Sequence, residues 1–205
     1  MITLYTYPTP NGQKASIMLE ELGLDYQARR VSLASGENLK PPFLSISPIG
    51  KIPALIEEDG GTTQRIFGSG AILTYLADKH GRLLPSDPAQ RAEALSWLTL
   101  GIGDLASAAG SLFRFAVMAS EKSPYAIEHF SGEIERCWKA LNTRLGNAEY
   151  LAGPEYSIAD IANYTFTHAS TQADSSLFQR FPNMKRWYDA VAARPAVERG
   201  MRVTG

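Results

Sequence analysis

Two short polar side chains, Thr9 and Asn11, lie in a segment rich in turn-forming residues at positions 8–12. A β-rich run over residues 2–7 precedes this segment, and a helical apolar pattern follows it. A hydroxyl or amide group beside a helix N-terminus can donate a hydrogen bond to an anion, and the helix dipole adds to the attraction. The turn therefore has the chemistry to stabilise an anionic atom without a metal ion.

The residues around this turn leave one alternative open. Asn is also a favoured N-cap, so Asn11 has a structural interpretation in which its side chain only starts the helix. Tyr5 and Tyr7 are alternate residues of the strand pattern and share one face, so we expect them to pack rather than to donate to a ligand. Residues 1–14 contain neither Ser nor Cys. Thr9 and Asn11 are therefore the predicted donors.

The charge composition excludes some classes of function. The chain has 20 basic and 21 acidic residues and a net charge of −1. Nucleic-acid-binding domains cluster Lys and Arg on one face, so this balance argues against such a role. The sequence has no uninterrupted apolar run of about 18 residues, and its N-terminus lacks the features of a signal peptide. We therefore expect a cytoplasmic protein without a membrane span.

The single cysteine, Cys137, excludes an internal disulfide and a C-x-x-C motif. A thioredoxin-type dithiol oxidoreductase is therefore excluded, and the composition fits a reducing compartment. Cys137 lies on the apolar stripe of a predicted helix and is expected in the core. His129 lies beside that stripe and is expected to be solvated. Asp160 has capping-box spacing after Ser157, so we expect it to support folding.

The first third of the chain alternates strand and helix signals, and the remainder has helix signals only. The predicted elements of the first part are, in order, strand 2–7, a helix with its apolar pattern over 15–22 and a stop at Gly23, strand 26–33, helix 42–45, strand 54–57, strand 62–67 and helix 69–80. This β-α-β-α-β-β-α order predicts a thioredoxin-like α/β domain over residues 1–80. Helix starts at Asp87-Pro88 and Ser123-Pro124 predict an all-α domain over residues 87–205, after a linker at 81–86.

Four tracts resemble the glutathione S-transferase superfamily, in the order and at the spacing of that family. They are residues 11–21, 47–55, 69–77 and 156–161. Within the superfamily, residues 8–12 are most similar to the Nu class, the disulfide-bond reductase-like glutathione transferases. The resemblance implies a glutathione-binding thioredoxin-like domain followed by an all-helical domain, with glutathione as cosubstrate and no metal.

The resemblance also implies roles for individual residues. Thr9 and Asn11 would lie near the glutathione sulfur and stabilise its thiolate. Ile52-Pro53 would have a cis peptide bond, and the main chain of Ile52 would pair with the cysteinyl backbone of glutathione. Lys51 would lie near the glycine carboxylate of the tripeptide. Asn38 is a second candidate for that end, with a solvated loop residue as the alternative.

The γ-glutamyl end of the implied site departs from the family pattern. Ser69, at the start of a predicted helix, would hold the γ-glutamyl carboxylate, and a simple N-cap role is compatible with this. Most relatives have an acidic or amide residue before this serine, where this sequence has Gly68. That residue normally receives the γ-glutamyl ammonium. Asp104 is a candidate replacement. Its Gly-Asp-Leu neighbourhood resembles the helix that, in several classes of the family, supplies an Asp from the partner subunit. The alternative is that Asp104 is simply an exposed residue of its helix.

The helix that contains Asp104 is rich in small residues, namely Gly101, Gly103, Ala106, Ala108, Ala109 and Gly110. Each interior Gly costs a helix about 1 kcal/mol relative to Ala, which indicates the close approach of a neighbour. Together with the resemblance, this predicts a homodimer.

The function implied by the resemblance is that of a detoxification enzyme. A glutathione transferase conjugates glutathione to a small electrophile, and a Nu-class member would also reduce a disulfide substrate through glutathione. The alternative is a non-catalytic binding or regulatory protein of the same fold, which the missing ligand contact at Gly68 favours.

Overall fold

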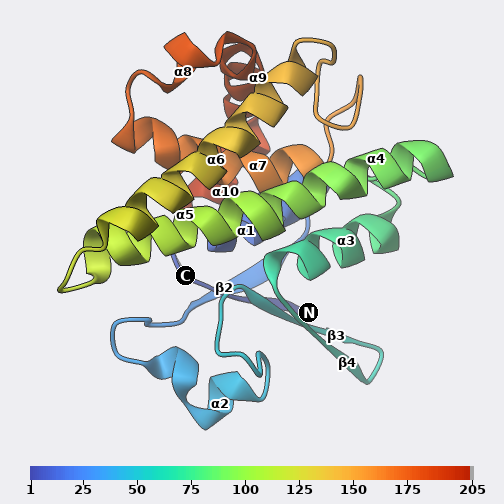
Figure 1. Cartoon of the computed structure of the whole chain (residues 1–205). Helices are drawn as coiled ribbons and strands as arrows, with labels where there is room; N and C mark the ends of the chain where they lie inside the picture. The colour runs from blue at the N-terminus through green and yellow to red at the C-terminus, as the bar shows by residue number, and fades with distance from the viewer. Residues whose placement is uncertain (204–205) are drawn as a thin grey trace. The chain divides into compact units, whose positions relative to one another are not determined.

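The structure is a computed structural model that describes residues 1–203. It divides the chain into two compact units (Figure 1). The first unit contains Met1–Leu84 together with the C-terminal segment from Ala192, and the second contains Pro85–Val191. The division between the units falls inside the predicted linker, whereas the return of the C-terminal segment to the first unit was not predicted.

The first unit is built on a four-stranded sheet. The strands are β1 (Ile2–Thr6), β2 (Tyr26–Arg30), β3 (Ala54–Asp59) and β4 (Thr62–Phe67). Their order across the sheet is β2-β1-β3-β4, with β1 parallel to β2 and the other two pairs antiparallel. The predicted β-α-β-α-β-β-α order and the parallel pair are both confirmed. Strand β2 ends at Arg30, three residues earlier than predicted.

Helices cover both faces of this sheet. They are α1 (Pro10–Leu22), the 3-10 turn η1 (Glu37–Leu39), α2 (Pro41–Leu44), α3 (Ser69–His80) and α10 (Pro195–Arg202). Helices α1 and α3 pack on each other and on the sheet, and α2 lies on the opposite face (Figure 1). There Phe43 of α2 forms a small apolar cluster with Val31, Ile46 and Ala54. Helices α1 and α3 end before Gly23 and Gly81, as predicted.

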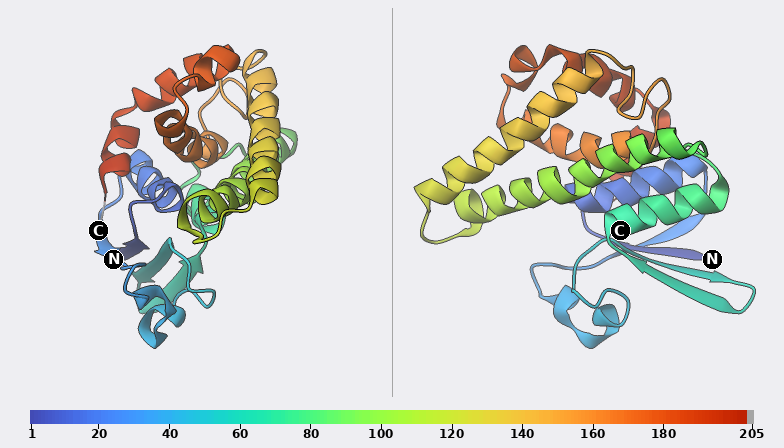
Figure 2. Two further views of the ribbon diagram at one scale, coloured as in Figure 1. Left: turned by 60° about the vertical axis from the view of Figure 1, so that its left-hand side comes forward. Right: turned by 45° about the vertical axis from the view of Figure 1, so that its right-hand side comes forward.

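Helix α10 is an element that sequence reasoning missed, and it packs along α1 (Figure 2). The Ser16 hydroxyl of α1 donates to the Gly200 carbonyl oxygen at 2.7 Å. A Cβ atom at Gly200 would lie 2.5 Å from the Cα of Ile17, so only glycine permits this approach. At the other end of α1, the guanidinium of Arg194 donates to both carboxylate oxygens of Glu21 at 2.7 and 2.8 Å. The C-terminal segment is therefore part of the unit that contains the predicted site.

The second unit is helical throughout. Its elements are α4 (Pro88–Thr99), the π-helical segment η2 (Leu100–Leu105), α5 (Ala106–Phe113), the π-helical segment η3 (Arg114–Met118), α6 (Pro124–Leu145), α7 (Ile158–Ala173), α8 (Leu177–Arg180) and α9 (Pro182–Ala192). The predicted caps are confirmed, because Asp87 accepts from two backbone N–H groups of α4 and Ser123 accepts from one of α6.

Residues 88–118 form one long helical stretch. Among the described residues, this stretch alone is long and apolar enough to cross a membrane, by length and composition only. Helices of soluble proteins pass the same test, and Asp104 and Arg114 interrupt the apolar residues. The stretch packs on α6 and α7 within its own unit. The absence of a membrane span stays a prediction.

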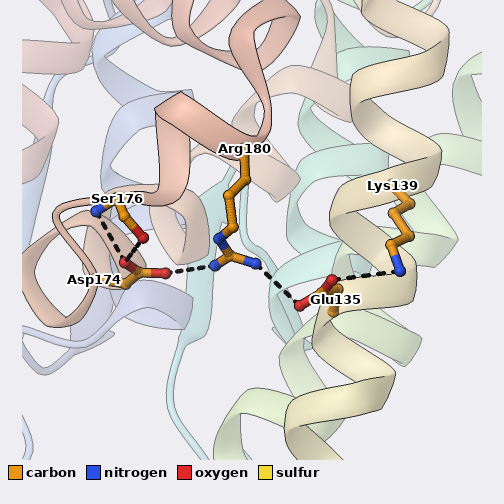
Figure 3. Close-up of polar contacts among 5 residues, drawn as sticks. All are labelled: Glu135, Lys139, Asp174, Ser176 and Arg180. Atoms are coloured by element: carbon orange, nitrogen blue, oxygen red, sulfur yellow. Dashed lines mark hydrogen bonds and ion pairs between the residues drawn. The ribbon is translucent and has the colours of Figure 1, made fainter.

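A short ionic network holds the segment after α7 against α6 (Figure 3). Arg180 of α8 bridges Asp174, at 2.5 Å, and Glu135 of α6, at 3.0 Å. Lys139 contacts the same Glu135 at 3.3 Å. All these side chains are partly exposed, so each pair contributes at most about 1 kcal/mol to stability.

The carboxylate of Asp160, by contrast, is fully buried at the start of α7. One oxygen accepts from the Leu151 backbone N–H at 2.9 Å and from the Trp187 indole at 2.8 Å. The other accepts from the Ser157 backbone N–H at 2.9 Å and from the Ser157 hydroxyl at 3.1 Å. The predicted capping box is confirmed. Asp160 also joins α7 to α9 and to the loop before it.

We predict that Asp160→Asn lowers the free energy of unfolding by about 3 kcal/mol, because the amide turns one acceptor into a donor that faces buried donors. Burial raises the pKa of Asp160 from 3.8 to about 6. The folded protein therefore binds this proton more tightly, and the contribution of Asp160 to stability falls as pH rises from about 4 to about 6. Urea denaturation across this range should show that the difference in the free energy of unfolding between wild type and variant becomes smaller as pH rises.

The matched control is Asp174→Asn, which removes a partly exposed carboxylate from the network in Figure 3. Its expected cost is below about 1 kcal/mol. Equal effects of the two substitutions would contradict the structural role of Asp160.

Candidate functional site

Apart from Asn38 of η1, the predicted site residues of the first unit come from three segments that meet at one edge of the sheet. Strand β1 pairs with β3 with Tyr5 opposite Ala54, and β3 pairs with β4 with Ala54 opposite Phe67. The Gly68 N–H extends this pairing by donating to the Pro53 carbonyl oxygen at 3.1 Å. Neighbouring strands lie about 4.8 Å apart, so the end of β1, the start of β3 and the end of β4 span about 10 Å. An extended tripeptide has this length.

Helices α1 and α3 both begin at this edge, directly after β1 and β4. Each helix therefore directs its N-terminal N–H groups and the positive end of its dipole toward the same region. This arrangement favours negatively charged ligand groups.

Thr9, and not Asn11, is the N-cap of α1. Its hydroxyl oxygen accepts from the Gly12 N–H at 3.3 Å, and Pro10 occupies the first helical position. The alternative interpretation of Asn11 as N-cap is therefore wrong, because Asn11 is the second helical residue. The cap uses a lone pair of Thr9 and leaves its hydroxyl hydrogen as a donor.

Gly12 is required by the close return of the preceding loop. A Cβ atom at this position would lie 2.2 Å from the Tyr7 carbonyl oxygen and 2.6 Å from the Thr6 hydroxyl oxygen. The Thr9 N–H donates to the same Tyr7 carbonyl at 2.7 Å. The loop that contains Thr9 is thereby held tightly against the first turn of α1.

Asn11 is oriented by a buried lysine. The Nζ atom of Lys14 donates to Oδ1 of Asn11 at 3.1 Å. Lys14 is 0% exposed, and burial lowers the pKa of its ammonium from 10.5 to about 7. An ammonium has donors only, so the amide oxygen faces it and the two amide N–H donors of Asn11 point elsewhere.

The loop before β3 has the predicted cis peptide bond between Ile52 and Pro53. The exposed Lys51 precedes it, and the Lys51 carbonyl accepts from the buried Ser47 hydroxyl at 2.8 Å. The amide of Asn38 donates to the Gly50 carbonyl at 2.8 Å. Asn38 therefore supports the loop that carries Lys51.

Gly68 and Ser69 begin α3. Gly68 is the N-cap and has a φ of 85° and a ψ of 130°, a conformation that L residues rarely adopt. Ser69 is the first helical residue and is buried, so the interpretation of Ser69 as a simple N-cap is wrong. The space beside Gly68 is open, since a Cβ atom would meet no atom within 4 Å.

Asp104 belongs to the second unit, where it lies in the π-helical segment η2 and is exposed. Within that unit its charge acts on the core residue Cys137: burial chiefly raises the pKa of this thiol, and the Asp104 carboxylate adds to the rise. Part of the small-residue pattern has an explanation inside the unit. A Cβ atom at Gly101 would lie 2.8 Å from the Asn163 amide, whereas Gly103 and Gly110 face open space.

Among the described residues, no group of three His, Cys, Asp or Glu side chains is arranged to hold a metal ion. The donors at the sheet edge are instead hydroxyl, amide, ammonium and backbone N–H groups. They suit a ligand with several anionic atoms.

Two domain families match the chain: the glutathione S-transferase N-terminal domain over residues 1–78 and the C-terminal domain over residues 105–195. The disulfide-bond oxidoreductase YfcG of Escherichia coli is 42% identical over 199 residues, which cover 96% of this chain and 92% of that protein. This chain belongs to the glutathione S-transferase family. The resemblance identified from the sequence is confirmed.

Other members of the family support this assignment. The disulfide-bond oxidoreductase YghU of Escherichia coli is 36% identical, over 97% of this chain and 73% of its own. A family member from Pseudomonas fluorescens, solved with two glutathione molecules bound, has a TM-score of 0.91 and 39% identity, covering 98% of this chain and 92% of its own. A glutathione transferase from Pseudomonas putida, solved with glutathione disulfide bound, has a TM-score of 0.92 and 36% identity. The match covers 100% of this chain and 92% of that one.

Sequence reasoning missed Lys14. One signal was available: Lys14 precedes Ile17 by three residues and Met18 by four, and both are fully buried. A lysine at this spacing lies on the apolar face of its helix.

We predict that Gly12→Ala lowers the free energy of unfolding by at least about 2 kcal/mol, because the new methyl group overlaps the Tyr7 carbonyl. In a helix without this contact, the same change is stabilising. Gly132 in α6 provides that control, since its Cβ position is open. Gly132→Ala should raise stability by about 0.5–1 kcal/mol. Urea denaturation of both variants would test this, and a stabilised Gly12→Ala protein would contradict the close approach.

Proposed function

We propose that this protein binds glutathione along the edge of its first unit and stabilises the thiolate for reaction with a disulfide. The observation that supports this most directly is the convergence of three segments: the Thr9–Asn11 turn, the cis Ile52-Pro53 loop and the start of α3 at Ser69. The glutathione and glutathione disulfide of the related structures fit a tripeptide site of this kind.

The energetic requirement at the sulfur is modest. A free cysteine thiol has a pKa of about 8.5, so only a few per cent is ionised near pH 7. Lowering this pKa by about 2 units requires about 2.7 kcal/mol. The Thr9 hydroxyl and the Asn11 amide each offer a donor, and a hydrogen bond to a charged group contributes about 1.5–3 kcal/mol. Two such donors satisfy the requirement.

The rest of the tripeptide would contact the other two segments. The main chain of Ile52 would pair with the cysteinyl backbone, and Lys51 would lie near the glycine carboxylate. Asn38 would act at this end by holding the Gly50 carbonyl. Ser69 and the N-terminus of α3 would bind the γ-glutamyl carboxylate.

The proposed reaction with a disulfide has two steps. The glutathione thiolate attacks one sulfur, forms a mixed disulfide and releases the other sulfur as a thiolate, which takes up a proton. A second glutathione thiolate attacks the glutathione sulfur of the mixed disulfide, giving glutathione disulfide and the second thiol. The similarity to YfcG and YghU, both named disulfide-bond oxidoreductases, favours this reaction. Conjugation to a small electrophile would use the same thiolate.

We also propose that the protein is a homodimer in which the exposed Gly103 and Gly110 face a second copy. Open space at both Cβ positions is compatible with close packing of another chain. In this proposed dimer, Asp104 of the second copy would serve as a partner for the γ-glutamyl ammonium in place of the residue missing at Gly68.

We predict that Asn11→Ala raises the thiol pKa of bound glutathione by about 1–2 units and lowers kcat/KM for a disulfide substrate about 10- to 100-fold. Titration of the thiolate absorbance of the complex measures the first effect, and steady-state kinetics measures the second. Thr9→Ser is the control, since it keeps both the cap and the hydroxyl donor and should behave like wild type.

Three results would overturn parts of this proposal. A wild-type complex whose thiol stays protonated above neutral pH would remove the catalytic role. Glutathione binding without turnover would leave a binding or regulatory protein. An unchanged thiol pKa in Asn11→Ala would remove Asn11 from the sulfur site.

We predict that Gly68→Glu tightens glutathione binding about tenfold, because the carboxylate restores a partner for the ammonium. The same substitution should lower the free energy of unfolding by about 1–3 kcal/mol, since a side chain there must adopt a positive φ. Gly68→Ala has the same backbone cost without the charge. Calorimetric titration with glutathione would compare the two, and equal affinities would contradict the prediction.

A further inference from the structure

A cavity of about 330 Å³ lies on the face of the sheet that α2 covers, opposite the face on which α1 and α3 pack (Figure 1). Its walls come from the first unit, namely from β1, the end of β2 and the segment from η1 to α2. Thr9, Asn11, Lys51 and Ser69 do not line it. The cavity is therefore separate from the donors that we assign to glutathione.

The floor of the cavity is apolar and partly aromatic. Val31, Phe43 and Ile46 line it and are almost fully buried, as members of the apolar cluster under α2. The half-buried Tyr5 packs against the same cluster, with its ring centre 6.2 Å from that of Phe43 and the two rings tilted by 54°. Aromatic rings favour such tilted contacts, so the floor suits the ring of a ligand.

The rim of the cavity is positively charged. Arg29 and Arg30 end β2, Lys40 directly precedes α2, and all three are exposed. The guanidinium carbon of Arg29 lies 5.9 Å from the ring centre of Tyr5, and that of Arg30 lies 4.8 Å from the ring centre of Tyr7. A guanidinium above a ring keeps its N–H donors, which lie in its own plane. These donors are free to bind an anion.

These three cations have no carboxylate partner. Among residues 1–203, no Asp or Glu forms an ion pair with Arg29, Arg30 or Lys40. Other basic side chains of the same unit do form ion pairs, namely Lys79, Arg194, Arg199 and Arg202. The lining has one acidic residue, Glu37, whose carboxylate accepts from the Ser32 N–H at 2.8 Å. Three basic residues and one acidic residue leave an excess of two positive charges, in a chain whose net charge is −1.

We propose that this cavity is a second ligand site, which binds a small aromatic carboxylate. The ring of the ligand would lie on Tyr5 and Phe43, and its carboxylate would accept from Arg29 and Arg30, with Lys40 adding charge at the rim. Guanidinium groups match the two oxygens of a carboxylate. This site does not depend on the proposed reaction with glutathione.

The volume and the charge of the cavity together define the ligand class. Small-molecule sites have volumes of about 300–1,000 Å³, so this cavity is at the lower end and suits one ring or two fused rings. A neutral aromatic molecule would gain only the contact with the floor, and a small anion without a ring would gain only the charge. A ligand with both parts should therefore bind more tightly than either.

A series of three ligands tests this requirement by calorimetric titration of the full chain. Naphthoate has both parts, naphthamide has the same rings without the charge, and acetate has the charge without the rings. Naphthoate should bind at one site per chain, at least about tenfold more tightly than either of the other two. Failure of naphthoate to bind below about 1 mM would overturn the proposal. Equal affinity for naphthoate and naphthamide would overturn the role of the cations.

Two substitutions of exposed arginines test the location. Arg29→Met removes one cation of the rim and should raise the dissociation constant for naphthoate about tenfold. The matched control is Arg65→Met in β4, at the opposite edge of the sheet from β2. It removes the same charge from an exposed position outside the cavity, so the dissociation constant should change by less than about twofold. Equal effects of the two substitutions would indicate general charge attraction and overturn the site.

A competition experiment separates this site from the proposed glutathione site. The dissociation constant for naphthoate should be the same with and without saturating glutathione. In amide NMR spectra of isotope-labelled protein, naphthoate should shift the signals of Val31 and Phe43 and leave those of Thr9 and Asn11 in place. Competition with glutathione, or shifts confined to Thr9 and Asn11, would overturn a separate site. If glutathione did not bind at all, the proposed function would fail while the titrations with naphthoate would still decide this inference.

Discussion

The backbone pairing of β3 with both of its neighbours is the constraint on which the candidate site depends. Strand β3 runs antiparallel to β1 and to β4, so its first residue lies beside the last residues of both. The Gly68 N–H then bonds to the Pro53 carbonyl one step beyond the strands. The ends of β1 at Thr6 and of β4 at Phe67 thereby become neighbours of the start of β3 at Ala54. A shift of one residue in either pairing would turn alternate side chains to the opposite face and separate these segments.

Within this frame, several residues of the candidate site also have a structural task. Thr9 caps α1 with its oxygen and keeps a hydrogen to donate. Asn38 holds the loop of Lys51, and Gly68 begins α3 in a conformation that suits glycine. The glycine avoids backbone strain at a position where, under the proposed function, an acidic side chain would contact the ligand. Stability and affinity are therefore set against each other at this position, and this chain has the residue that favours stability.

Local patterns in the sequence were sufficient to predict most of the fold. The helix starts at Asp87 and Ser123 and the capping box at Ser157 follow from side chains that act within one turn. Thr9 and Asn11 were predicted as donors from local composition and resemblance, but which of them caps the helix depends on where the loop returns. The Tyr7 carbonyl approaches the Cβ position of Gly12, and no local propensity contains that contact.

Long-range packing accounts for what the sequence did not reveal. Helix α10 joins α1 across about 180 residues, through contacts of Gln13 and Ser16 on either side of the buried Lys14. The residues beyond Pro195 were predicted to belong to the helical domain, because amphipathic spacing identifies a helix but not the element that it packs against. The π-helical segments η2 and η3 likewise continue a helical pattern without a separate signal.

The position of α10 has a consequence for how the protein is made. Residues 1–84 leave the ribosome before α10 does, yet the face of α1 around Ile17 is completed only by Gly200, and Glu21 is paired only by Arg194. During synthesis, the nascent first unit therefore exposes an apolar strip and an unmatched carboxylate until residues 194–202 emerge. Both α1 and α10 must be translated before the unit that contains the proposed glutathione site is complete.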